Sequence, residues 1–227
     1  MILAIRPEPG CQASVTAGQA AGLAIERCPL FEIRPLEWAL PPGQFDGLLL
    51  GSANALRHPG PLVDNLVDIP VYAVGEATGE AARQRGFAVV RTGHGGLQDL
   101  LDDMAGEPLR LLRLAGREHV PLTPPPRIAI ETAVAYDSVG LALPGRVAAQ
   151  LANGALVLLH SAAAARRFAA ECDRLAVRRG EIRLAALGPR IAQAAGTGWA
   201  EVRSAAEPNE AALLALAREM CHDPSQG

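Results

Sequence analysis

The sequence predicts an α/β fold made of two similar parallel-sheet lobes, which arise from duplicated units and are crossed by a pair of extended linkers. Short apolar runs rich in Leu, Val and Ile alternate with Ala-rich helical patterns, which is typical of α/β proteins with a largely parallel sheet. Several of these strand–turn–helix segments occur twice, in the same order. Two loop-like stretches also come at corresponding points of the halves. Together these observations favour two lobes over one continuous sheet.

The repeat becomes visible when the segments of the two halves are compared. Residues 45–58 (FDGLLLGSANALRH) resemble residues 154–167 (GALVLLHSAAAARR), and each segment is a strand that ends in a serine-containing turn and opens a helix. The alternative is that all strand–turn–helix units look alike, but ordered matches at nearly one offset favour an internal duplication. These matches are Arg6 with Arg113, Glu26 with Glu131, Ser52 with Ser161, and Gly75 with Gly188.

Two stretches rich in proline and glycine are the expected linkers. The first covers residues 35–43 and breaks the apolar periodicity, and the second covers residues 137–145. They follow Phe31 and Tyr136, which occupy equivalent places in the repeat. Two parallel linkers would form a hinge, with a ligand held between the lobes.

Composition limits the classes of function. The 227 residues are 49% hydrophobic and 20% charged, which is enough apolar surface for a folded core. The net charge is −3, whereas a nucleic-acid binder needs a basic face, so we expect no nucleic-acid partner. The sequence contains no lysine, which excludes lysine Schiff-base chemistry and a P-loop lysine.

The chain shows no pattern for a membrane or a metal. The first apolar run, Met1–Ile5, is far shorter than the roughly 20 residues of a membrane span, so we expect neither a targeting segment nor a membrane partner. The cysteines are scattered, without a CxxC pair or a nearby histidine pair, which predicts thiols rather than a metal site. Sparse, unpaired cysteine suits the reducing cytosol, and we therefore expect a cytoplasmic protein.

The turns after the apolar strands carry the candidate chemistry. In parallel sheets, ligands bind beyond the carboxyl ends of the strands, where helix N-termini present unpaired N–H groups. Ser52 and Ser161 are either simple N-caps or members of an amide-rich cradle for carboxylates. No turn matches GxGxxG or GxxxxGK[ST], which disfavours nucleotide binding. The candidate turns are 51–54, 75–78, 160–162 and 188–190.

Other catalytic arrangements are weaker. His160 directly precedes a serine in an apolar strand and is interpreted as a strand-end residue, and neither serine has the GxSxG context of a nucleophile. The remaining histidines, His58 among them, show no metal-ligand spacing. Tyr136 stands out because its repeat counterpart is Phe31, which lacks the hydroxyl, although a boundary tyrosine with a hydrated tip is an equally good interpretation.

With these motifs in order, the chain resembles the uroporphyrinogen-III synthase family. The resemblance covers nearly the whole chain, although each motif alone is short. It departs from the family at Gly51, where threonine is common, in the 160–162 turn, which lacks an expected proline, and in residues 116–127, usually a full helix but here rich in proline. The motifs are Leu-Gly-Ser-Ala-Asn-Ala (50–55), Ala-Val-Gly-Glu-Ala-Thr (73–78), Ala-Tyr (135–136), Leu-His-Ser-Ala (159–162) and Leu-Gly-Pro (187–189).

The resemblance implies a fold and a reaction. It implies two α/β lobes joined by a two-stranded linker, one lobe formed by residues 1–35 and 140–227 and the other by residues 40–135. It also implies cyclisation of hydroxymethylbilane to uroporphyrinogen III by a hydro-lyase, with inversion of the last pyrrole ring and loss of water. The resemblance further implies that the reaction needs neither a cofactor nor a metal. We also expect a monomer.

The resemblance also implies roles for individual residues. Tyr136 would assist departure of the substrate hydroxyl. Arginines would bind substrate carboxylates, with a solvated surface charge as the alternative for each of them: Arg6, Arg113, Arg117 and Arg190. The alternatives are a non-catalytic, hinged module that binds carboxylates or tetrapyrroles, and a nucleotide-dependent transferase. The expected substrate-binding residues are Arg6, Ser52, Ala53, Asn54, Gly75, Thr78, Arg117, Ser161, Ala162, Gly188 and Arg190.

Overall fold

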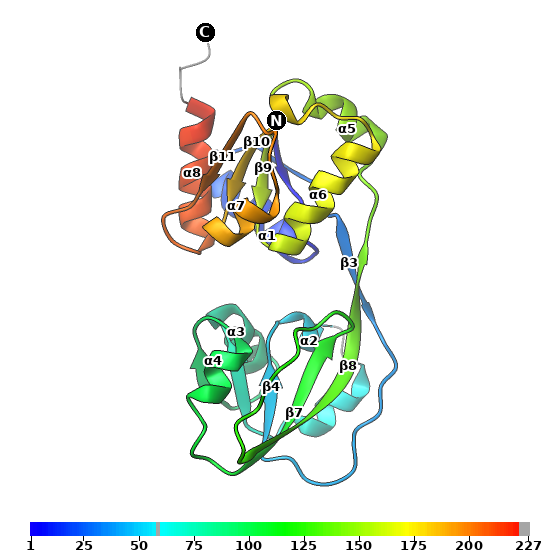
Figure 1. The fold of residues 1–227 in the computed structure, drawn as a ribbon, viewed down its shortest axis with the longest axis vertical. Helices are drawn as coiled ribbons and strands as arrows, with labels where there is room; N and C mark the ends of the chain where they lie inside the picture. Colours follow the sequence, from blue (N-terminus) through cyan, green and yellow to red (C-terminus); the bar gives the residue numbers. More distant parts are fainter. Residues whose placement is uncertain (58–59, 223–227) are drawn as a thin grey trace. The chain divides into compact units, whose positions relative to one another are not determined.

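The computed structural model describes residues 1–57 and 60–222, and it divides the chain into two compact units (Figure 1). Unit 1 comprises Met1–Glu32 and Val139–Gly227, and unit 2 comprises Ile33–Ser138. His58 lies outside the described residues. Each unit has its own sheet and its own hydrophobic core, so each is described separately.

Unit 1 is a five-stranded, wholly parallel sheet in the order β11-β10-β9-β1-β2 with helices on both faces. One face packs on α5, α6 and α7, and the other packs on α1 and α8, because successive residues of each buried strand point to opposite sides. The elements are β1 (Ile2–Ala4), α1 (Gly10–Ala20), β2 (Ile25–Arg27), α5 (Gly145–Leu151), β9 (Leu156–Leu159), α6 (Ala162–Arg174), the 3-10 helix η2 (Arg179–Glu181), β10 (Arg183–Ala186), α7 (Pro189–Ala194), β11 (Glu201–Ser204) and α8 (Glu210–His222).

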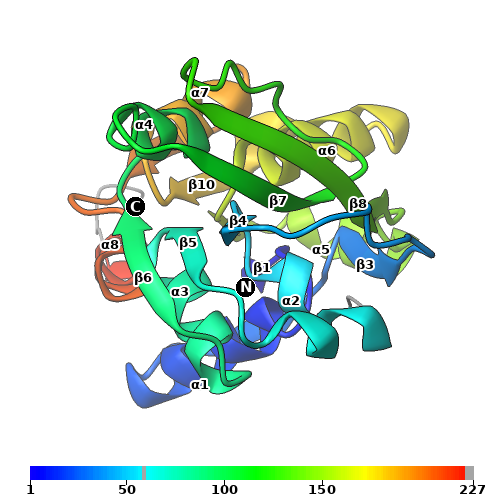
Figure 2. The same cartoon turned by 90° about the horizontal axis from the view of Figure 1, so that it is seen from below.

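Unit 2 contains a six-stranded sheet in the order β3-β8-β7-β4-β5-β6, in which β8, β7, β4, β5 and β6 run parallel. Figure 2 shows β7 beside β8 and β5 beside β6. The elements are β3 (Phe31–Pro35), β4 (Gly47–Leu50), α2 (Asn54–Arg57), the 3-10 helix η1 (Pro61–Leu66), β5 (Val71–Val74), α3 (Glu76–Gln84), β6 (Val89–Gly93), α4 (Leu97–Asp102), β7 (Leu109–Gly116) and β8 (Ile128–Gly140).

The predicted duplication is consistent with the registers of the two sheets. In unit 1, Leu3 pairs with Val157 on β9 and Glu26 on β2. In unit 2, Leu112 pairs with Leu48 on β4 and Glu131 on β8. Each sheet therefore takes two strands from the front of one half of the chain and three strands from the back of the other half, and the sheet of unit 2 adds β3 as a sixth, edge strand.

One pairing of the repeat needs correction. Sequence comparison matched Arg6 with Arg113, but the register that equates Leu3 with Leu112 places Arg113 at the position of Ala4. The identity of the two arginines misled the alignment because each follows a short run of aliphatic residues. Arg6 lies beyond the end of β1, whereas Arg113 lies within β7.

The chain passes between the units along β3 and β8, which are neighbours in the sheet order (Figure 1). Leu36 N–H donates to the Ala135 carbonyl at 2.9 Å, and Leu141 N–H donates to the Leu30 carbonyl at 2.8 Å. The stretch 137–145, which the sequence predicted as a loop-like linker, instead begins as the last residues of β8, because this pairing keeps the backbone extended.

Residues 117–127 form no helix in the structure. The four prolines at positions 121 and 124–126 explain this, since proline lacks the N–H that a helix interior requires and restricts the residue before it. The structure thus agrees with the interruption that the prolines of this segment indicate in the sequence. Among the described helices, none combines the length and the hydropathy needed to cross a membrane.

Candidate functional site

A cavity of about 370 Å³ lies within unit 2, beyond the carboxyl ends of its parallel strands. Its walls come from the turn after β4, the end of β7, the start of α4 and the non-helical segment after β7. Parallel α/β sheets bind their ligands at this end, beyond the carboxyl ends of the strands. The lining residues that bear on its chemistry are Ser52, Arg113, Gly116, Glu118, His119 and Tyr136.

Tyr136 reaches this cavity from β8. Its ring lies over Gly116 of the neighbouring strand, where a Cβ atom would come within 2.7 Å of the ring. Position 116 therefore needs glycine, because the tyrosine ring occupies the space that a side chain would take. The ring is therefore held against β7, and the residue lines the cavity.

Arg113 is the buried charge of the site. The residue is only 6% exposed, and Nη1 donates to the Val120 carbonyl at 2.9 Å. Desolvation lowers the pKa of Arg113 below its usual value, and the nearby Tyr136 offsets this only in part. Within residues 1–57 and 60–222, no carboxylate lies within ion-pair distance of Arg113.

The turn 51–54 contributes one wall of the cavity. Gly51 and Ser52 line it, and the Ser52 hydroxyl oxygen accepts the Asn54 N–H at 3.2 Å. Ala53 is buried, and the Asn54 side chain accepts a hydrogen bond from Arg57 at 3.0 Å. The serine hydroxyl thus shapes the turn, as one of the two sequence interpretations expected, and the residue also borders the cavity.

Gly75 and Thr78 lie at the start of α3 and do not line the cavity of unit 2. Gly75 has φ = 77°, a left-handed conformation that favours glycine, and its N–H donates to the Gly93 carbonyl at 3.0 Å. Thr78 is 6% exposed. The structure therefore gives Gly75 a turn-forming role and gives Thr78 a packing role.

Thr78→Ala is expected to destabilise the protein by about 1 kcal/mol, because the substitution removes buried side-chain atoms. Thermal unfolding measures this loss. Turnover should be assayed well below the melting temperature. A fall in turnover without a fall in melting temperature would contradict the packing role and place the hydroxyl against the substrate.

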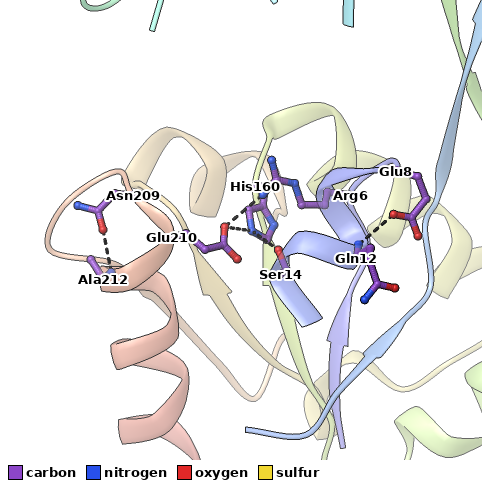
Figure 3. A network of polar contacts seen from close by, with 8 residues as sticks. All are labelled: Arg6, Glu8, Gln12, Ser14, His160, Asn209, Glu210 and Ala212. Atoms are coloured by element: carbon purple, nitrogen blue, oxygen red, sulfur yellow. Dashed lines mark hydrogen bonds and ion pairs between the residues drawn. The ribbon is translucent and has the colours of Figure 1, made fainter. Parts of the chain in front are cut away.

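The corresponding end of the sheet in unit 1 carries a polar network (Figure 3). Glu210, the first residue of α8, bonds Arg6 at 3.1 Å and His160 Nε2 at 3.0 Å. The Ser14 hydroxyl contacts the same Nε2 at 3.4 Å. Because serine and carboxylate share one ring nitrogen, this cluster is not the relay of a hydrolase, in which they contact opposite nitrogens.

Burial alone would raise the pKa of Glu210, but hydrogen bonds from His160 and Ser14 and the charges of His160 and Arg6 lower it below its usual value. Glu210 is therefore ionised and neutralises Arg6. Arg6, an expected substrate-binding residue, lies just beyond the end of β1, and its charge is already paired with Glu210. A substrate carboxylate that used Arg6 would compete with Glu210.

The other expected residues of unit 1 lie at helix starts. Ser161 is the N-cap of α6, its Oγ accepting the Ala164 N–H at 3.1 Å, and Ala162 is the first residue of that helix. Gly188 is the N-cap of α7, and Arg190 lies exposed on the first turn. These residues thus place backbone N–H groups beyond the carboxyl ends of β9 and β10.

Ser161→Ala is expected to cost about 1 kcal/mol of stability, because the N-terminal N–H of α6 loses its side-chain acceptor. Denaturant unfolding measures the cost. Ser161→Asn serves as the control, since asparagine caps helices about as well, and a loss of stability equal to that of the alanine variant would count against the capping role.

Arg117 lies beside the cavity in sequence but does not line it. It is exposed and paired with Asp137 at 2.8 Å. The sequence interpretation selected Arg117 and named Arg113 only as one arginine among several. The missed signal was position: Arg113 stands between aliphatic residues in a buried strand, where a charged residue is rare unless it is paired or used.

His119 is one of the remaining histidines that the sequence interpretation set aside for lack of metal-ligand spacing. It lines the cavity, and its Nδ1 lies 2.8 Å from the Gly116 carbonyl, which fits an Nδ1–H donor.

The described residues offer no alternative metal or thiol chemistry. In this part of the chain, no group of three or more His, Cys, Asp or Glu residues could hold a metal ion. Burial raises the pKa of Cys11 to about 11 and that of Cys172 to about 12, so these thiols are unreactive.

Two parallel α/β units with duplicated strand order, one of them containing a cavity lined by an arginine and a tyrosine, define a two-lobed α/β protein with a candidate ligand site. The family model of uroporphyrinogen-III synthase HemD matches residues 12–215. The chain belongs to the uroporphyrinogen-III synthase family, and it is therefore an enzyme of tetrapyrrole biosynthesis, a cyclising hydro-lyase that acts on a small-molecule tetrapyrrole.

Solved structures show the same fold. The uroporphyrinogen-III synthetase of Helicobacter pylori 26695 is 18% identical, with a TM-score of 0.66 over 96% of this chain and 98% of that chain. A mutant uroporphyrinogen III synthase of the extremely thermophilic bacterium Thermus thermophilus is 15% identical, with a TM-score of 0.56 over 98% of this chain and 100% of that chain. Among curated proteins, no significant match is found.

Proposed function

We propose that the cavity of unit 2 holds the reacting end of hydroxymethylbilane while the chain closes it to uroporphyrinogen III, with inversion of the last pyrrole ring. The observation that carries this proposal is the position of Tyr136, whose ring lines the cavity at the carboxyl ends of the strands. A cavity of about 370 Å³ is small for a ligand site, so it suits one end of a linear tetrapyrrole rather than all of it.

Tyr136 donates a hydrogen bond to the hydroxyl of the substrate as the carbon–oxygen bond breaks. The hydroxyl takes the phenolic proton of Tyr136 and leaves as water, and the electrons of the adjacent pyrrole nitrogen stabilise the resulting azafulvene cation. The proton that the closing pyrrole carbon loses when the new bond has formed restores the tyrosine, so that one water is lost overall. Because the substrate itself supplies this electrophile, the protein acts mainly by positioning the chain so that the inverted closure is faster than the direct one.

Carboxylates of the remaining rings bind to backbone N–H groups at the strand ends of both units. The proposed turns are 52–54 in unit 2 and Ser161, Ala162 and Gly188 in unit 1. Arg190 is exposed and, within the described residues, has no ion-pair partner, whereas Arg6 and Arg117 are each paired with a carboxylate. We place the enzyme in the cytoplasm as a cofactor-independent monomer with no nucleic-acid or membrane partner.

The test is the isomer that the purified chain produces from hydroxymethylbilane. The products are oxidised to porphyrins and separated chromatographically, beside a reaction without protein. Uroporphyrin III is expected from the enzyme. Only the type I isomer, which forms spontaneously, would instead identify a module that binds tetrapyrroles without catalysing the closure. Light scattering of the same sample tests the monomer.

A further inference from the structure

The two units differ at one equivalent place in the repeat. Between β1 and β2, unit 1 has the helix α1, which packs Cys11 and Val15 against its sheet. Between β7 and β8, unit 2 has the proline-rich, non-helical segment 117–127. The cavity lies where this segment passes over the sheet, since Val120, Pro121 and Leu122 form part of its wall.

The strand that precedes this segment, β7, also differs from its counterpart β1 at one buried position. Ala4 of β1 is fully buried against the helices of unit 1, and the matching position of β7 is Arg113. Arg113 shares a sheet face with Leu111 because the two residues are two positions apart on one strand. The loss of a helix and the gain of an arginine therefore occur together, in unit 2 alone.

Arg113 contributes little that the fold needs. Within the described residues, its side chain donates to the carbonyl of Val120, a residue that is 74% exposed and lies in a segment where water can replace the guanidinium as donor. Burying a guanidinium without a carboxylate costs free energy, whereas an apolar side chain would cost none. Glu118 also lines the cavity, but it is exposed and, among the described residues, not paired with Arg113.

The geometry points to Arg113 as the residue that binds one carboxylate of the pyrrole ring held in this cavity. A guanidinium binds a carboxylate through two parallel N–H donors, which fixes orientation as well as position. The substrate carboxylate is then the anionic partner that Arg113 lacks among the described residues. Tyr136 faces the same bound ring. This inference rests on the proposed function and assigns the substrate charge that the unit 2 site recognises.

The test compares Arg113→Met, Arg113→Lys and Arg110→Met. Arg110 is the matched control because it lies on the same strand, pairs with Glu131 and donates to the Pro42 and Gln44 carbonyls, away from the cavity. Each variant is assayed for thermal stability and for KM and kcat with hydroxymethylbilane. Uroporphyrin III, a carboxylate-bearing product analogue, serves as a non-reacting ligand in thermal-shift titrations.

Arg113→Met is expected to keep or raise the melting temperature while raising KM about 10- to 100-fold, the factor that one charge-assisted hydrogen bond contributes. Arg113→Lys should give a smaller rise in KM, since lysine keeps the charge but not the paired donors. The stabilisation by uroporphyrin III should fall with Arg113→Met. Arg110→Met should lower the melting temperature and leave KM unchanged.

An Arg113→Met enzyme with the KM of the wild type would overturn the inference, as would an unfolded Arg113→Met variant, which would show that the fold needs the guanidinium. Either result leaves the proposed function intact if the wild-type chain forms uroporphyrinogen III. A wild-type chain that yields only the type I isomer removes the proposed function first.

Discussion

Tyr136→Phe is expected to slow formation of uroporphyrinogen III about 100-fold while the protein remains folded. The magnitude is that of a positioned proton donor at the lower end of its usual range. The ring packs over Gly116 and against the core around Leu48, and phenylalanine keeps that packing. The initial rate of type III formation measures the effect, and the share of the type I isomer should rise because the spontaneous reaction continues.

The interpretation has a steric control. Gly116→Ala keeps the hydroxyl but adds a Cβ that would lie 2.7 Å from the Tyr136 ring, so it displaces the ring instead of removing the donor. If the direction of the hydroxyl matters, this variant should also lose type III activity. A Tyr136→Phe enzyme with unchanged rate and isomer ratio would take the tyrosine out of the mechanism and leave His119 as the next donor to test.

The sequence predicts the fold well because its signals are local. Short apolar runs, such as 47–50 and 156–159, become fully buried strands, and the turns after them open helices. The duplication places matching strands in matching order. Sequence comparison equated Arg6 with Arg113, however, since identity is a weaker guide to register than hydrogen bonding along the whole strand.

The site is predicted less completely because its contacts are long-range. Tyr136 was found through the hydroxyl that its counterpart Phe31 lacks. The ion pair between Arg6 and Glu210 joins opposite ends of the chain, and no local pattern predicts it. Arg113 was named only in a group, because its burial depends on a strand pairing and on the non-helical segment that directly follows β7.

The contacts that hold the chain where it returns to unit 1 after β8 are also long-range. Two residues of α6 hold the backbone that follows β8: Arg167 donates to the Leu141 carbonyl at 2.9 Å, and Glu171 accepts the Leu143 N–H at 2.8 Å. Glu171 also pairs with Arg174 at 2.7 Å and with Arg167 at 3.3 Å. The Glu171 side chain is 5% exposed, so its charge depends on these partners.

Glu171→Gln is expected to destabilise the protein by about 2–3 kcal/mol at pH 7, because a buried carboxylate loses its charge-assisted hydrogen bonds. Urea unfolding of both proteins measures the difference. Glu76→Gln is the matched control: Glu76 pairs with Arg83 at 2.7 Å but is 72% exposed, and its loss should leave stability unchanged within error. If both substitutions lowered the free energy of unfolding equally, burial of the Glu171 carboxylate would not explain its contribution.

The difference between the wild type and Glu171→Gln should depend on pH in one direction. The Arg174 hydrogen bond lowers the pKa of Glu171 despite its burial, with help from the Leu143 N–H and the charges of Arg167 and Arg174. A carboxyl whose pKa is lower in the folded state stabilises that state above its unfolded pKa of about 4.3, and the contribution disappears as the pH falls through the folded value. The stability difference should therefore be constant from about pH 7 to 5 and narrow below about pH 4. A difference that widened on acidification would mean that Glu171 is protonated in the folded protein, and the clamp on residues 141–143 would then rest on neutral hydrogen bonds.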